Sequence, residues 1–374
     1  MGEKKRIIVS VTNDLYSDQR VHKVCTFLNE NGMQVLLVGR KKRNSPDLAP
    51  RAYSTKRFKL LFERGAAFYA CYNLRLFFFL LFSKADLLLS NDLDTLLANY
   101  CAKRFRKKCA LIYDTHELFT EVPELASAPK KRAVWLKIER SIFPKLKKTY
   151  TVNTSIAAIY EEKYGVKVNV VRNVAPRWTP KEILDRSALG LPKDKKIVIL
   201  QGAGINVDRG AEEAVAAMEF IENTVLAIVG SGDIISQLKK YVKAKKLDEK
   251  VLFFDRHPYE KLMQFTANAD LGLSLDKDTN ANYRFSLPNK VFDYLQAGTP
   301  ILASNLVEIK HVIEKHDIGK ITTSHEPKEI AKHINEILFD EHRLKTLKSN
   351  CLIASKSENW EKESQLLKPI FEIA

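Results

Sequence analysis

Apolar residues in this chain fall into short, nearly uniform runs that are separated by longer amphipathic stretches. The runs cover Ile7–Val11, Val35–Val38, Leu87–Leu89, Ala110–Tyr113, Val168–Val171, Ile197–Leu200, Val225–Val229, Val251–Phe254, Leu271–Leu275 and Ile301–Ala303. Uniform runs of this length predict parallel strands that are covered on both faces. Between the first two runs, Val21, Val24, Cys25 and Leu28 follow the spacing of one helix face, and Gly32 ends that helix. The alternation predicts a doubly wound α/β architecture.

The alternating pattern occurs twice. Its first copy ends near Val174, a segment with two prolines at 175–180 forms a linker, and the second copy begins near Lys195. A last helix is predicted over Asn359–Ile373, with no strand after it. We therefore expect two Rossmann-like domains, residues 1–174 and 175–358, followed by a separate segment, 359–374. In such a pair, ligands bind where the carboxyl ends of the strands face a shared cleft.

Composition narrows the class of partner. The chain has 374 residues with 45% hydrophobic content, enough for two packed cores, and a net charge of +16. That charge favours an anionic partner, such as nucleic acid, an anionic membrane or a phosphorylated substrate. We find no nucleic-acid reading motif and expect no nucleic-acid partner.

The cysteines and the lengths of the apolar runs lead us to expect a cytoplasmic protein. The five cysteines form no Cys-x-x-Cys pair, so we expect no zinc site, and scattered free thiols fit a reducing cytoplasm. The run Ile7–Val11 is too short for a signal-peptide core, and no stretch reaches the ~18 apolar residues that span a bilayer.

Two segments are strongly basic. Arg40–Arg75 has ten Lys and Arg against two acids, and Lys130–Lys148 has eight against one. The first leads into Leu74–Phe82, where phenylalanine and leucine lie beside arginine. This composition suits a helix at an anionic membrane surface, and it equally suits a core helix with a solvated basic face.

The segment Ser286–Pro300 is the most informative. Pro288 can begin a helix, and Gly298 with Pro300 ends it. The N-terminus of a helix is a ready site for phosphate, and Lys290 in the first turn is favourable only beside an anion. The alternative makes Lys290 a solvated lysine and Asp293 an ordinary helix carboxylate.

Two further loops of the second half follow apolar runs. Gln201–Gly210 combines glycines, which let the backbone approach a ligand, with Arg209, which can bind phosphate through two hydrogen bonds. The turn 230–233 reads Gly-Ser-Gly-Asp. Neither has the Gly-x-Gly-x-x-Gly pattern, and both also suit simple connecting turns.

In the first half, Ser90–Asp94 and Asp114–Glu117 each follow a predicted strand. His116 lies where α/β proteins bind ligands, so it could donate hydrogen bonds or transfer protons. The alternative is helix capping, for which Asn91, Asp92 and Thr115 are all suitable.

Taken in order, these motifs resemble those of the large retaining family four of GT-B-fold glycosyltransferases. The segment 18–23 resembles its Asp-Pro-Arg-Val motif, 114–117 its His-Asp/Glu segment, 201–210 its Gly…Lys-Gly loop, and 229–233 its Gly-x-Gly turn. Ser286–Pro300 resembles its sugar-nucleotide segment, and the last helix resembles the one that crosses back to the first domain.

The resemblance implies a retaining hexosyl transfer from a nucleoside-diphosphate sugar to a glycan or lipid-linked acceptor, in cell-surface polysaccharide synthesis. It implies that the protein is cytoplasmic or peripheral on the inner face of the membrane. Metal and other cofactors are not expected, because Arg209, Lys290 and the helix dipole would balance the diphosphate. The donor would contact Gly202, Arg209, Gly230, Ser231, Gly232, Asn289, Lys290 and Asp293, with the nucleotide ribose on Asp293. His116 would hold the donor sugar, and Asp92 and Glu117 would meet the acceptor.

Three departures from the family pattern stand out. Phe285 and Asp293 replace the paired glutamates, and Ala203 replaces the arginine beside the first loop glycine. In the family that this chain resembles, the first glutamate touches the donor sugar, and Asp276, Asp278 and Asn282 are the candidates to replace it. Two alternatives stay open: a sugar-nucleotide epimerase or hydrolase of the same fold, and a nonenzymatic basic protein that binds membranes or glycans.

Overall fold

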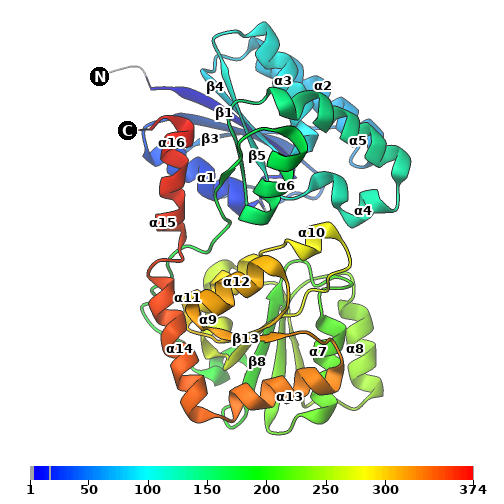
Figure 1. The fold of residues 1–374 in the computed structure, drawn as a ribbon, viewed down its shortest axis with the longest axis vertical. Coiled ribbons are helices and arrows are strands. Elements are labelled where there is room, and N and C mark those ends of the chain that lie inside the picture. Colours follow the sequence, from blue (N-terminus) through cyan, green and yellow to red (C-terminus); the bar gives the residue numbers. More distant parts are fainter. Residues whose placement is uncertain (1–3, 17, 374) are drawn as a thin grey trace. The chain divides into compact units, whose positions relative to one another are not determined.

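The computed structural model describes residues 4–16 and 18–373. These form two compact units, one ending at Arg172 and resuming at Ser364, the other running from Asn173 to Glu363. The first unit thus contains the end of the chain. Each unit is built on one sheet (Figure 1).

The first unit has a seven-stranded parallel sheet in the order β3-β2-β1-β4-β5-β6-β7. Its strands are β1 (Arg6–Asp14), β2 (Gln34–Lys41), β3 (Ser54–Lys59), β4 (Leu87–Asn91), β5 (Ala110–Thr115), β6 (Thr149–Thr151) and β7 (Asn169–Val170). The buried central strand β1 pairs through Ile8 with Leu36 on one side and Leu88 on the other. The strand order reverses there, which in doubly wound folds places ligands at the carboxyl ends of the neighbouring strands.

Helices cover both faces of this sheet. They are α1 (Gln19–Glu30), α2 (Gly65–Phe82), α3 (Leu93–Phe105), α4 (Pro123–Ala126), α5 (Pro129–Ile142), α6 (Thr154–Tyr164) and α16 (Leu367–Phe371). Helices α2, α3 and α5 lie together on one side (Figure 1). Asp18 caps α1 by accepting a hydrogen bond from the Val21 amide at 3.1 Å, which explains why the helix begins there.

The second unit has a six-stranded parallel sheet in the order β10-β9-β8-β11-β12-β13. Its strands are β8 (Lys196–Gly202), β9 (Thr224–Gly230), β10 (Val251–Phe254), β11 (Leu271–Ser274), β12 (Ile301–Ser304) and β13 (Gly319–Thr322). Its helices are α7 (Ala211–Ala217), α8 (Ile235–Ala244), α9 (Tyr259–Asn268), α10 (Ala281–Arg284), α11 (Asn289–Ala297), α12 (Val307–His316), α13 (Pro327–Leu338), α14 (Glu341–Ser355) and α15 (Trp360–Glu363). Single-turn 3-10 helices occur at Phe119–Glu121, Phe143–Lys145, Arg186–Leu189, Met218–Phe220 and Ser364–Leu366.

The predicted two-sheet α/β fold is confirmed, and all ten predicted strands are present. Three strands were missed: β3, β6 and β13. The outer strands β3 and β13 are only partly buried, so their sequences lack a uniform apolar run. Strand β6 is buried but has only three residues, Thr-Tyr-Thr, too few to carry a pattern.

The end of the chain needs correction. The single helix predicted over Asn359–Ile373 is instead α15, a 3-10 turn and α16 in succession. The change of unit falls inside this segment, between Glu363 and Ser364, rather than before residue 359. The other boundary follows Arg172 instead of residue 174. The first three residues and Ala374, which the predicted domains also included, lie outside the described residues.

Candidate functional site

In the second unit, Arg209 and Lys290 converge on one carboxylate. Arg209 Nη1 lies 2.8 Å from Asp276 Oδ1, and Lys290 Nζ lies 3.3 Å from Asp276 Oδ2. Asp276 follows β11 and is fully buried, whereas Arg209 keeps 31% of its side chain exposed. Burial alone would raise the pKa of Asp276, but the charges of Lys290 and Arg209 outweigh it and lower that pKa. Asp276 is therefore a carboxylate at neutral pH and forms an ion pair with Arg209.

The guanidinium of Arg209 is held on a second side by an aromatic ring. Its central carbon lies 4.2 Å from the centroid of the Tyr283 ring, a cation–π geometry. Its Nε is buried and has no hydrogen-bond partner among the described residues. Such a donor needs an acceptor, since an unpaired buried polar atom is costly.

The N-terminus of α11 has no side-chain cap. Pro288 is the N-cap residue and supplies no side-chain hydrogen bond, so Asn289 and Lys290 begin the helix without a capping side chain. Ser286 Oγ, just before the helix, is buried and unpaired within the described part of the chain. Gly298 ends α11 with φ of +72°, as the sequence predicts. Lys290, this helix end and Ser286 Oγ together suit an anion.

The two glycine loops pack tightly against each other. Gly230 has φ of +142°, and a Cβ there would lie 1.8 Å from the carbonyl oxygen of Gly202. A Cβ on Gly232 would meet the Ile205 carbonyl oxygen at 1.9 Å. The Ser231 amide donates to the Gly202 carbonyl at 3.1 Å. The glycines are thus required by contact between the loops, so in this structure they have a packing role that needs no ligand.

Asp293 lies inside the second unit, with 8% of its surface exposed. It accepts hydrogen bonds from Gln201 Nε2 at 3.1 Å and from the Tyr259 hydroxyl at 3.3 Å. Gln201 is fixed in turn, because its Oε1 accepts from Thr266 Oγ1 at 2.7 Å. Asp293 is therefore a buried carboxylate with fixed partners and not a solvated one on the helix surface.

In the first unit, His116 is enclosed by carboxylates. Its Nδ1 lies 3.1 Å from Asp92 Oδ2, and its Nε2 lies 3.1 Å from Asp114 Oδ2. Burial alone would lower the pKa of His116, but the charges of Asp92 and Asp114 and their hydrogen bonds raise it well above its ordinary value. The ring is therefore an imidazolium at neutral pH. Because an imidazolium has no lone pair, the alternative in which His116 accepts a proton is not supported.

Arg20 holds Asp114 from the other side. Arg20 Nε and Nη2 donate to the two oxygens of Asp114 at 3.1 and 2.9 Å, and Nη1 donates to the Val171 carbonyl at 3.0 Å. Burial alone would raise the pKa of Asp114, but Arg20 and His116 bring it down to about 2. Four side chains of alternating charge are therefore linked in a row, Arg20 to Asp114, Asp114 to His116 and His116 to Asp92.

Asp92 combines strain with two contacts to His116. Its φ of 56° and ψ of 167° lie in a region that essentially only glycine occupies. Its Oδ1 accepts from the His116 amide at 2.8 Å, and its amide donates to the Asp114 carbonyl at 2.8 Å. Asp92 does not cap α3 by a side-chain hydrogen bond, so the capping alternative is wrong for this residue. Glu117 follows His116 and is half-buried.

Helix α2 buries a single stripe of side chains. Phe68, Tyr72, Leu76 and Leu80 are buried, whereas Leu74, Phe78 and Phe82 are 61%, 50% and 81% exposed. By length and composition, α2 could cross a membrane, so the expectation that no segment is long enough needs correction. It arose because Asn73 and Arg75 interrupt the apolar residues of α2. The Lys56 ammonium lies 4.6 Å from the Phe79 ring, and Arg75 lies 4.8 Å over Phe58.

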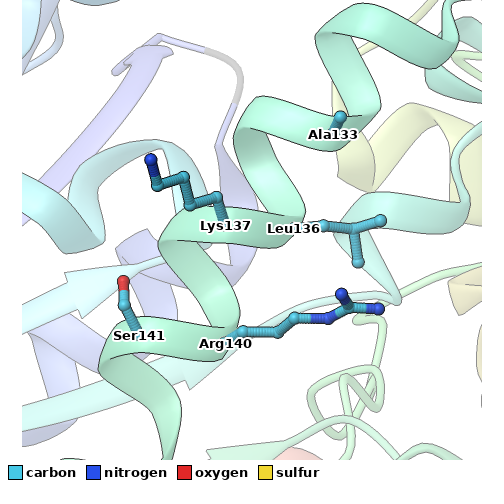
Figure 2. Close-up of a pocket in the computed structure, with 5 residues that line it drawn as sticks. All are labelled: Ala133, Leu136, Lys137, Arg140 and Ser141. Atoms are coloured by element: carbon cyan, nitrogen blue, oxygen red, sulfur yellow. The ribbon is translucent and has the colours of Figure 1, made fainter.

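A pocket of about 470 Å³ lies beside α5. Figure 2 shows the side chains that line it, Ala133, Leu136, Lys137, Arg140 and Ser141, all from this one helix. None of them is a predicted site residue. Within the described residues, no group of three or more metal-ligating side chains is placed to hold a metal ion.

The sequence did not predict the ion pairs of two residues, Arg20 and Asp276. Arg20 was noticed only as part of a motif, and Asp276 was one of three candidates for contact with the donor sugar. Asp278 is instead engaged by Arg284, 2.9 Å from its Nε. A useful signal was available for Arg20, because a charged residue on the apolar face of a predicted helix needs a buried partner.

Comparison with known proteins places the two halves in one class. Residues 18–175 match the model of Glycosyltransferase Family 4, and residues 182–351 match that of Glycosyl transferases group 1. The Candida albicans chitobiosyldiphosphodolichol beta-mannosyltransferase is 26% identical over 194 residues, which are 48% of this chain and 41% of that protein. The chain thus matches less than half the length of that relative.

Solved structures match over nearly the whole chain. Sucrose-phosphate synthase from Thermosynechococcus elongatus has a TM-score of 0.79 at 18% identity and covers 99% of this chain and 100% of its own. HepE from Anabaena, in complex with UDP and glucose, has a TM-score of 0.75 at 15% identity and covers 99% of each chain. At these identities the likeness concerns the fold. With the two family matches in order along the sequence, the chain belongs to the GT-B-fold glycosyltransferases and resembles family four.

Proposed function

We propose that this protein transfers a hexosyl group, with retention at the anomeric carbon, from a nucleoside-diphosphate sugar to a glycan or lipid-linked acceptor in cell-surface polysaccharide synthesis. The observation that carries the proposal is the meeting of Arg209 and Lys290 beside the uncapped start of α11. A leaving diphosphate gains negative charge in the transition state, and fixed cations with a helix N-terminus stabilise such charge. These groups would balance the diphosphate, so no metal cofactor is part of the proposal.

Other donor contacts follow from the same site. Asp293 would accept hydrogen bonds from the ribose hydroxyls, and the Gln201 and Tyr259 contacts would hold its carboxylate in place. The glycine turns 202 and 230–232 and Asn289 would line the path of the nucleotide. Arg209 Nε and Ser286 Oγ have no hydrogen-bond partner in the described part of the chain, and phosphate oxygens would supply one to each. Relatives solved with UDP and with UDP-glucose make uridine nucleotides the first to try.

The first unit would supply the acceptor side. The His116 ring, held in place by Asp92 and Asp114, would contact the donor sugar, and Asp92 and Glu117 would contact acceptor hydroxyl groups. The backbone strain at Asp92 supports a functional role there, because strained residues cluster at ligand sites. By analogy with the family, the acceptor would attack on the same face as the leaving group, so no protein nucleophile would be required.

We propose that the acceptor is carried on lipid and that α2 brings the protein to an anionic membrane from the cytoplasmic side. Leu74, Phe78 and Phe82 are exposed on α2. Lys56 lies against the ring of Phe79 in the same helix, and Arg75 of α2 lies over the ring of Phe58. Apolar insertion combined with cations is the usual basis of interfacial binding. The curated relative is named for a dolichol-linked chitobiose acceptor, which supports a lipid-linked acceptor here.

The test is a panel of UDP-, GDP- and ADP-sugars. Thermal unfolding identifies the donor, because a ligand at 100 times its dissociation constant adds about 2.7 kcal/mol of stability. Transfer to lipid-linked glycan acceptors is then measured, and NMR of the product gives its anomeric configuration. Stabilisation by one sugar nucleotide with retained configuration is expected. Donor turnover that is identical with and without any acceptor would instead favour a hydrolase or epimerase.

A further inference from the structure

We propose that Asp276 is a positioning residue that competes with the bound diphosphate for Arg209 and Lys290, and thereby limits how tightly the nucleoside-diphosphate product is held. The inference rests on the proposed function, because it concerns the same diphosphate site. It replaces the sequence-based expectation that Asp276 contacts the donor sugar.

The geometry leaves the carboxylate little capacity for a sugar. One oxygen of Asp276 faces Arg209 at 2.8 Å, and the other faces Lys290 at 3.3 Å and accepts from Ser274 Oγ at 3.4 Å. The residue has no exposed surface. Both oxygens are thus directed at the protein's own cations, whose side chains are 31% exposed for Arg209 and 12% exposed for Lys290.

The charge balance gives the expected effect. Asp276 reduces the combined charge of Arg209 and Lys290 from two to one, and every phosphate oxygen that approaches them competes with it. In a partly buried site, charges about 4 Å apart interact much more strongly than in water, so this competition is large enough to weaken product binding. Product release limits turnover in many enzymes, which gives such a carboxylate a kinetic benefit.

The experiment compares wild type with Asp276→Asn, which keeps the shape of the side chain and removes its charge. Isothermal titration with inorganic pyrophosphate, and then with UDP, GDP and ADP, measures affinity; steady-state kinetics with the donor identified above measures turnover. We expect Asp276→Asn to bind pyrophosphate at least about tenfold more tightly, with kcat and KM both lower. A variant that is only partly folded would have a lower kcat but would not bind pyrophosphate more tightly.

A matched control exists in the same unit. Asp270 also pairs with one arginine and one lysine, Arg186 at 2.9 Å and Lys348 at 3.1 Å, but it precedes β11 whereas Asp276 follows that strand. Asp270→Asn should therefore leave pyrophosphate affinity unchanged. If Asp276→Asn is insoluble, Asp276→Ala is purified with pyrophosphate, which should replace the missing charge and restore folding.

The outcomes separate the two proposals. Failure of wild type to bind pyrophosphate or any nucleoside diphosphate overturns the proposed diphosphate site itself. With wild-type binding intact, three results overturn the role of Asp276: weaker pyrophosphate binding by Asp276→Asn, which makes the carboxylate a simple organiser; unchanged binding with loss of the sugar nucleotide alone, which makes it a sugar contact; and variants that stay unfolded in pyrophosphate.

Discussion

Arg20 and Asp114 form a buried ion pair in which Nε and Nη2 of the guanidinium donate to the two carboxylate oxygens at 3.1 and 2.9 Å. The two residues come from α1 and from the carboxyl end of β5, and both are almost fully buried. The same Asp114 oxygen that accepts from Arg20 Nε lies 3.1 Å from Nε2 of His116. Arg20 therefore fixes the carboxylate that orients the histidine.

Arg20→Met should destabilise the first unit by about 3–5 kcal/mol, because it leaves the Asp114 charge buried without its strongest partner. Denaturant unfolding measures the change. The control is Arg343→Met: Arg343 also binds an aspartate, Asp317, through two hydrogen bonds of 2.8 and 2.6 Å, but this pair is half exposed. It should cost at most about 1 kcal/mol. Equal costs for the two variants would contradict the importance of burial at Arg20.

Asp94 should make the protein less stable as the pH rises. Burial and the nearby charge of Asp92 raise the pKa of Asp94 to about 8, and a hydrogen bond from Thr12 offsets this only in part. Because the folded state holds this proton and the unfolded state releases it near pH 4, the stability contribution is lost between about pH 4 and pH 8. Asp94→Asn should lose less stability than wild type between pH 5 and pH 8 in urea unfolding.

His116 changes stability in the same direction, since its folded pKa is also raised, so the comparison of wild type with Asp94→Asn is essential. Its contribution is complete below about pH 6.5 and is lost as the pH passes its folded pKa. It is present in both proteins, and the difference between the two curves reports Asp94. Parallel curves would show that Asp94 is ionised throughout.

Replacing Arg209 or Lys290 with alanine should lower turnover by about 10²–10³, if each acts as a donor to the developing diphosphate charge. The control is Lys348→Ala. Lys348 also pairs with a buried aspartate, Asp270, and its replacement should keep near-normal turnover. Circular dichroism verifies folding of each variant. Normal turnover in a folded Lys290→Ala variant would remove Lys290 from the site.

Asp293→Asn should weaken nucleoside-diphosphate binding about tenfold or more, because hydrogen bonds to a charged group contribute about 1.5–3 kcal/mol. Calorimetric titration gives the dissociation constant. Asp278→Asn is the comparison, since Asp278 is half exposed and engaged by Arg284. If Asp293→Asn leaves the dissociation constant unchanged, Asp293 does not bind the nucleotide, and its role is structural, through contacts such as those with Gln201 and Tyr259.

Phe78→Glu should reduce binding to vesicles that contain anionic lipid, because it places a charge in the exposed stripe of α2 and repels the surface. Phe339→Glu is a matched control, since Phe339 is 51% exposed against 50% for Phe78 but lies in the second unit, after α13. Vesicle sedimentation at low and high salt measures both. Equal binding by the two variants would assign the basic surface to solubility or to attraction of anionic substrates.

A charge reversal of the basic segment has to avoid Arg57. Its Nη1 lies 3.6 Å from Asp14 in a pair that is largely buried and donates to the Pro46 carbonyl at 2.9 Å, so its replacement would disturb the fold. Lys56 is the better choice, because among the described residues its ammonium forms no ion pair and lies 4.6 Å from the Phe79 ring. Lys56→Glu should weaken vesicle binding and make it less sensitive to salt, which the same sedimentation assay reads out.

The amino-acid sequence by itself determined the architecture and the order of the loops that carry the site. Uniform apolar runs such as Ile197–Leu200 are typical of strands in a covered parallel sheet, and Pro288 with Gly298 delimits α11 through local backbone chemistry. These signals act over a few residues, so they are legible without the fold.

Only the tertiary structure decided which charges meet. Arg20 and Asp114 are 94 residues apart and Arg209 and Asp276 are 67 apart, and no local pattern specifies such pairs. Likewise, composition left α2 equally suited to a core and to a membrane surface, and packing settled that one stripe is buried and another exposed. The physical reason is common to all three cases: burial and ion pairing depend on which distant surface comes to lie against a residue.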